Sequence, residues 1–267
     1  MGLFNFFKKK VEPNKIISKE NKTFEFYGTG RHLKNDEEYQ SINKEEADNA
    51  FKKYKREILD VYMKEKGFHK YKTNGYVRLN KNRLVEYINI QKEAHGSRTC
   101  TLNISLYPLY APHDFITIGF GKRIGRIIND KDFWWDYKDD ITAKLSFENI
   151  KNALEQFVIP WFEYYKDEEN YIEDLLNRKY QIGFDCIIWT TFLFLKRNDK
   201  ESARNYLEGI KEFDYFLDSS KQIEPVALNN INKMNEIMKE NADIENYLKE
   251  VEKANIEKFK LPKSFFK

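Results

Sequence analysis

Cysteine, proline and glycine are scarce in this 267-residue chain, and each shortage excludes a class of protein. The two cysteines, Cys100 and Cys186, lie in apolar runs with no His or Cys at ligand spacing. A disulfide scaffold needs more cysteines in a shorter chain, so we expect two buried free thiols and a cytoplasmic protein. Six prolines and eleven glycines are too few for collagen-like or long low-complexity segments.

Patterns that mark common catalytic centres are missing as well. No two of the four histidines lie three or four residues apart, and no GxSxG motif occurs. Zinc hydrolases and deaminases therefore lack their ligands, and a serine hydrolase lacks its nucleophile turn. The sequence predicts no metal site, no cofactor and no catalytic residue that can be named, so enzymatic activity stays undecided.

The chain also has no excess of charge of one sign. Its 46 Lys and Arg residues nearly balance its 43 Asp and Glu residues, for a net charge of +3. A protein that binds nucleic acid through phosphates usually has a clearer basic excess, so another protein is the expected partner. The longest interior apolar run, Cys186 to Leu195, is too short to span a bilayer.

The strongest structural signal lies between Gly67 and Tyr107. Leu84 to Gln91 and Thr99 to Tyr107 alternate apolar and polar residues, which is typical of strands with one buried face. In the second run Cys100, Leu102, Ile104 and Leu106 share one side, while Thr99, Thr101, Asn103 and Ser105 share the other. The pattern predicts an antiparallel sheet whose apolar face carries helices.

Helical patterns flank this sheet on both sides. Asn43 and Glu46 resemble a capping box for a helix that ends near Gly67. Ser146 is the expected N-cap of a later helix, which Pro160 should kink or break. A short strand over residues 23–27 and one long helix over 229–251 complete the expectations.

These elements predict an α+β fold. An antiparallel sheet of about four to five strands packs against helices and precedes an all-helical C-terminal extension. The expected divisions are a tail and linker over residues 1–42, an α+β domain over 43–178 and the helical extension over 179–267.

A basic run, Phe120 to Arg126, follows a predicted strand and raises the question of anion binding. A P-loop would need glycine five residues before the Gly-Lys pair, where the chain has Ile116, and the dinucleotide fingerprint is one residue out. A strand-end turn with solvated arginines is favoured. The alternative is an anion or acidic partner bound by Arg123 and Arg126.

Two further pairs of residues are candidates for binding. Trp134 and Trp135 adjoin several aspartates, so they either anchor a basic partner or fill the core; we expect at least one to be buried. Gln91 and Asn103 place polar groups on adjacent strands. They form either a polar binding surface, with Arg78, or a solvated sheet face held by cross-strand hydrogen bonds, which is favoured.

Several short motifs appear in an order that is typical of one family. They are Gly67-Phe68, Tyr76 with Arg78, Ile88 to Lys92, Thr101 to Ile104, Arg123 to Gly125, Trp134-Trp135 and Ile159 to Trp161. Over about residues 43–176 the chain resembles the DUF4304 family of mostly bacterial proteins of unknown function. The resemblance implies an α+β fold and no particular activity, cofactor or catalytic residue.

Two hypotheses of different classes follow. The favoured one is a non-enzymatic cytoplasmic protein-binding module, with an immunity or antitoxin-like role as one form of it. The alternative is an enzyme or binding protein for a phosphorylated or nucleotide ligand. In that case Lys122, Arg123 and Arg126 would bind the anion, and Gln91 and Asn103 would orient the ligand.

Overall fold

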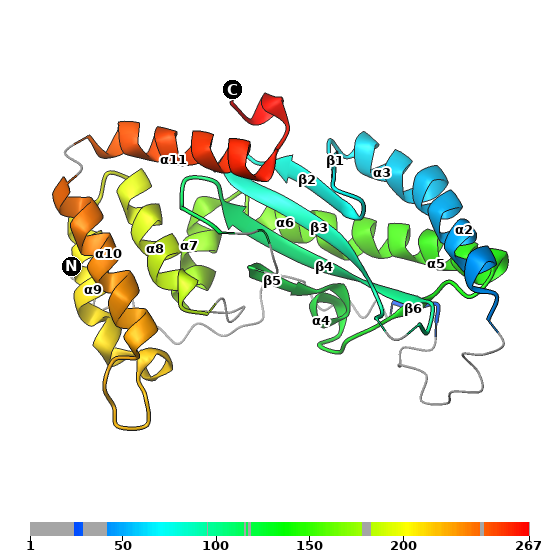
Figure 1. Ribbon diagram of the computed structural model, residues 1–267, viewed down its shortest axis with the longest axis horizontal. Helices are drawn as coiled ribbons and strands as arrows, with labels where there is room; N and C mark the ends of the chain where they lie inside the picture. Colours follow the sequence, from blue (N-terminus) through cyan, green and yellow to red (C-terminus); the bar gives the residue numbers. More distant parts are fainter. Residues whose placement is uncertain are drawn as a thin grey trace.

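The sheet at the centre of the protein is an antiparallel meander. The computed structural model describes residues 24–28, 42–94, 96–114, 116, 119–177, 183–240 and 243–266. Five strands lie in chain order across the sheet, and a sixth short strand, β6, pairs with β4 (Figure 1). Their bounds are β1 His69–Tyr71, β2 Gly75–Leu79, β3 Leu84–Lys92, β4 Thr99–Pro108, β5 Phe120–Arg123 and β6 Trp135–Asp136.

The longest ladder joins β3 and β4, and it separates two faces. Ile88 pairs with Ile104, and Asn89 pairs with Asn103, so apolar and polar partners alternate along the ladder. We call the face that carries Ile104 the first face and the face that carries Asn103 the second face. The predicted division of β4 into an apolar and a polar side is confirmed, since side chains alternate across a strand.

Two parallel helical rods contact the first face. The first rod is α2 (Lys44–Tyr54), η2 (Lys55–Leu59) and α3 (Asp60–Glu65); the second is α5 (Asp140–Ala153), η3 (Leu154–Val158) and α6 (Ile159–Tyr164). Asn43 caps α2, as predicted. The second rod begins earlier than expected. Asp139 rather than Ser146 is its N-cap, and Ser146 instead donates a hydrogen bond to the carbonyl of Asp136 from inside the helix.

Pro160 does not end the second rod. The π-helical segment η3 lies immediately before it, and the chain continues into α6. A proline has no N–H to donate within a helix, so the backbone near it must adopt another hydrogen-bonding pattern. Of the expected kink or break, the break does not occur: the regular α-helix is interrupted by the wider turn of η3 just before the proline, and helix resumes around it.

Helices make up the described part of the chain after β6 and α5–α6, as predicted. They are α7 Glu168–Leu176, α8 Asp185–Lys196, α9 Lys200–Gly209, α10 Pro225–Glu240 and α11 Ile244–Phe259, with the short segments η4 Ile210–Glu212, η5 Asp214–Phe216 and η6 Lys263–Phe266; α4, Ile124–Ile128, follows β5. The single helix expected over 229–251 is instead two, because Asp243 caps a new helix there.

The C-terminal segments α8, α11 and η6 contact the second face of the sheet or the loop that follows β4. Trp189 of α8 contacts the Tyr107 ring at a centroid distance of 5.8 Å, and Phe265 contacts the His69 ring. Asn255 of α11 donates two buried hydrogen bonds to the carbonyls of Leu109 and Ala111. Figure 1 shows α8, α9 and α10 gathered at one end of the sheet, with α11 leading back over β3.

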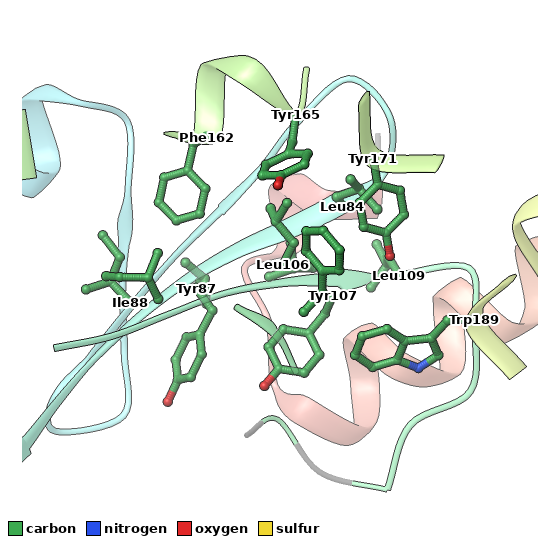
Figure 2. Close-up of a cluster of buried hydrophobic side chains, with 14 of the residues drawn as sticks. Leu84, Tyr87, Ile88, Leu106, Tyr107, Leu109, Phe162, Tyr165, Tyr171 and Trp189 are labelled. Atoms are coloured by element: carbon green, nitrogen blue, oxygen red, sulfur yellow. The ribbon is translucent and has the colours of Figure 1, made fainter. Parts of the chain in front are cut away.

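Aromatic side chains occupy both sides of the β3–β4 ladder. Figure 2 shows Phe162 and Tyr165 on one side, and Tyr87, Tyr107 and Trp189 on the other. Each of these side chains has less than a tenth of its surface exposed. The second face is thus partly a core face as well, which the alternating sequence alone did not predict.

Residues 24–28 join the aromatic core without forming the expected strand. Phe26 stacks on Phe133 at a centroid distance of 4.0 Å. Asn149 of α5 accepts hydrogen bonds from the Tyr27 backbone N–H and the Trp135 indole, and it donates one to the Glu25 carbonyl. These side-chain contacts replace the sheet pairing that the sequence pattern suggested.

The close approach of β5 to β4 generates a stability prediction. A Cβ at Gly121 would lie 1.8 Å from the Ile104 carbonyl oxygen, whereas a Cβ at Gly209 would meet nothing within 4 Å. We expect Gly121→Ala to lower the free energy of unfolding by about 1–3 kcal/mol or more, because backbone must move apart. Gly209→Ala is the matched control. Urea denaturation monitored by circular dichroism measures both, and equal stability of the two variants would contradict the packing described.

His113 generates a second prediction. Its ring lies against Tyr107 and Trp189, and burial lowers its pKa from 6.5 to about 4. Between these values the unfolded chain binds a proton that the folded protein does not. Stability should therefore fall by up to about 3 kcal/mol as the pH drops through this window.

The control for this prediction is His113→Gln, which keeps an N–H donor and does not titrate. We expect it to lose this part of the pH dependence in urea titrations at pH 7.5 and pH 4.5. If the wild type and the variant lose stability in parallel, His113 is not the group that titrates.

Candidate functional site

Polar side chains gather on the second face near its β5 edge. Asn103 pairs with Arg123 in the β4–β5 ladder, so their side chains lie next to each other. The Asn103 side-chain N–H donates to the Gln91 side-chain oxygen at 3.0 Å. The structure therefore brings together three residues that the sequence singled out, from three strands.

This polar cluster is not the solvated face that was the favoured expectation. Thr101 and Asn103 have 0% and 4% of their surface exposed. The Thr101 hydroxyl and the Asn103 side-chain oxygen are buried and have no hydrogen-bond partner among the described residues. The hydrogen bond between Gln91 and Asn103 does supply the expected cross-strand link. The cluster is therefore a buried polar pair beside two oxygen atoms, of Thr101 and Asn103, that form no hydrogen bond among the described residues.

The arginines beside this cluster are already paired. Arg123 and Arg126 both bind Asp132, at 2.8 and 2.6 Å. Hydrogen bonds from Arg126 and Arg123 hold the pKa of Asp132 below its usual range, so the carboxylate stays charged. The predicted solvated turn is instead a short ion-pair network, in which the carboxylate of Asp132 contacts both arginines.

Both tryptophans of the Trp134–Trp135 pair are buried, on opposite faces. The Arg123 guanidinium lies 5.4 Å from a Trp134 ring, on the second face. Trp135 pairs with Cys100 across the β4–β6 ladder and lies on the first face, where its indole donates to Asn149. With neither ring exposed, an anchoring role for a basic partner finds no support in this geometry.

Arg78 lies on the other face from Gln91 and Asn103. It pairs with Glu86 in the β2–β3 ladder and binds its carboxylate. The Arg78 guanidinium also donates to the Lys66 carbonyl at 2.8 Å and stacks over the Phe68 ring. Burial raises the pKa of Glu86, and the adjacent Arg78 opposes that rise. The predicted grouping of Arg78 with the two amides is therefore wrong, because the ladder places the Arg78 side chain on the first face and those of Gln91 and Asn103 on the second.

The structure adds a surface that the sequence analysis missed. A groove of about 480 Å³ runs between the two helical rods, on the side away from the sheet. Tyr54, midway along the first rod, binds Asp140 at the start of the second. Lys66, just after the first rod, reaches Glu155, midway along the second, so the rods run in the same direction. The groove is lined by Glu57, Ile58, Val61, Tyr62, Glu65, Glu148, Lys151 and Asn152.

Exposed apolar side chains continue this groove along α5. Val61 is 50% exposed, Ile141 is 70% exposed and Leu145 is 38% exposed. Ile141, Leu145, Glu148 and Asn152 recur at spacings of four, three and four, so they form one stripe of the helix. A helix start placed at Ser146 hid this stripe, since Ile141 and Leu145 then lay outside the helix.

Two kinds of site find no support among the described residues. No group of three or more His, Cys, Asp and Glu side chains in the described ranges could hold a metal ion. None of the helices in that part of the chain combines the length and apolar character needed to cross a bilayer.

Comparison with known proteins connects this architecture to a family. No curated protein and no solved structure gives a significant match to the chain. Residues 59–164 match the model of DUF4304, a domain of unknown function, within the 43–176 region where the resemblance was expected. The match runs from η2 through the whole sheet to α6, and it excludes α7 to α11. This part of the chain, with the sheet, α3 and the second helical rod, is therefore a DUF4304 domain.

Proposed function

We propose that this protein is a non-enzymatic protein-binding module, and that the groove between the two helical rods binds a basic, amphipathic segment of its partner. The observation that carries the proposal is a set of exposed apolar side chains: Val61 in the groove, and Ile141 and Leu145 in the α5 stripe. Burying such side chains against a partner removes apolar surface from water. The parallel rods also provide the groove in which a helix can lie.

The charges around the groove favour a basic partner. Three of its lining residues are glutamates, Glu57, Glu65 and Glu148, and one is a lysine, Lys151. Glu65 and Glu148 form no ion pair within the described ranges. The groove is therefore locally acidic although the whole chain carries a net charge of +3. Such a rim steers a partner of the opposite sign and sets its orientation.

The expected non-enzymatic role and the expected cytoplasmic location are both consistent with this proposal. A protein that acts through a surface needs no catalytic centre, and an immunity or antitoxin role is one form of that function. Both cysteines are buried free thiols, which supports a cytoplasmic location. Arg123 and Arg126 both pair with Asp132, so they lend less support to an anion-binding role.

Photocrosslinking in native cells tests the groove directly. A photoreactive amino acid at Leu145 should crosslink a discrete, basic partner protein. The same amino acid at Leu228 is the matched control, because Leu228 is similarly exposed, at 45%, but lies on α10. Mass spectrometry identifies the products. Products that are the same from both positions, or a second copy of this chain from Leu145, would contradict the proposal.

Charge reversal and apolar substitution then test the chemistry with the identified partner. We expect Glu65→Lys with Glu148→Lys, and separately Ile141→Arg, to weaken binding at least about tenfold. All three positions are exposed, so stability should change by no more than about 0.5 kcal/mol. Val226→Arg on α10 is the control for Ile141→Arg. Fluorescence anisotropy gives the dissociation constants, and unchanged affinity in both groove variants would refute the groove as the binding surface.

A further inference from the structure

A second recess lies at the opposite end of β2 from the β1–β2 turn. It has a volume of about 440 Å³ and is formed by the β2–β3 turn, the residues that lead into β1, and the C-terminal segment η6. Four of its lining residues carry basic side chains and none is acidic. Its polar lining consists of His69, Arg78, Asn80, Lys81, Arg83 and Ser264.

One lining residue carries a buried hydrogen-bond donor that has no partner among the described residues. Asn80 is 93% buried, since 7% of its surface is exposed. Its side-chain oxygen accepts from the backbone N–H groups of Asn82 and Leu84, at 2.9 and 3.1 Å, and its amide nitrogen has no partner. One terminal nitrogen of Arg78 is also buried without a hydrogen bond, but it lies 3.6 Å from a carboxylate oxygen of Glu163 in an ion pair. Buried donors are normally satisfied, so the Asn80 amide points to a missing acceptor.

The positive charge in the recess is only partly neutralised. Arg83 binds Glu252 and also donates to the Phe265 carbonyl at 2.9 Å, which ties η6 over the recess. Lys81 and His69, by contrast, are exposed and form no ion pair within the described residues. Arg78 and Arg83 therefore line the recess while they bind other groups of the protein. The exposed side chains of Lys81 and His69 supply the donors that a ligand can reach first.

From these observations we infer that the recess binds a phosphorylated small molecule. A lining of donors with no carboxylate selects an anion, and lysine is a common ligand for phosphate. The volume lies in the range of small-molecule sites and leaves space for more than the phosphate itself. The recess shares no lining residue with the groove between the helical rods, so this inference does not depend on the proposed function.

Isothermal titration of the full chain at low ionic strength tests the inference. The probe is ribose 5-phosphate, with ribose as its uncharged control. We expect the phosphate ester to bind and ribose not to bind. Lys81→Glu and His69→Glu should each weaken binding at least about tenfold, since the first replaces a favourable charge by a repulsive one and the second replaces a hydrogen-bond donor by a repulsive charge. Lys233→Glu, an exposed position on α10, is the control and should bind as the wild type does.

Asn80→Asp tests the buried donor separately. It keeps the oxygen that caps the β2–β3 turn and removes the unpaired amide N–H, so binding should weaken while circular dichroism confirms the fold. Three results would overturn the inference: no binding of ribose 5-phosphate, equal binding of ribose, or affinities in the Lys81→Glu and His69→Glu variants that match that of Lys233→Glu.

Discussion

The β3–β4 ladder is the constraint on which the rest of the structure depends. It pairs nine residues of each strand without interruption, from Leu84 with Pro108 to Lys92 with Cys100. Because the side chains of a strand alternate, this register assigns each residue of both strands to one face or the other. The helical rods pack on the face of Ile88 and Ile104, and the C-terminal helices reach the face of Tyr107.

Burial of both faces determines where binding surfaces remain. A sheet with one open face could use that face for recognition, as Gln91 and Asn103 first suggested. Here that cluster is buried, its two amides bind each other, and the adjacent arginines both pair with Asp132. The exposed features that lack partners lie at the periphery instead, between the rods and at the end of β2. Both arise where separate elements meet, so neither consists of one contiguous motif.

Much of the fold followed from local patterns. The alternation in β3 and β4 and the Asn43 cap agreed with the structure, and the family resemblance agreed with the family model. Predictions failed where another interaction in the structure outweighed the local sequence preference. Asp139 replaced Ser146 as the N-cap because its side chain and that of Thr142 form a reciprocal capping box. Pro160 did not end its rod, because the preceding π-helical segment accommodates it.

The sequence by itself determined the α+β class, the antiparallel strands and the faces of β4, because alternation and capping act between residues close in the chain. Only the tertiary structure decided which cations are free. Arg123 and Arg126 meet Asp132, Arg83 meets Glu252, which is 169 residues away in the chain, and Lys81 meets no acid among the described residues. Charge pairing depends on distances in space, and a single sequence carries no record of which distant residues approach each other.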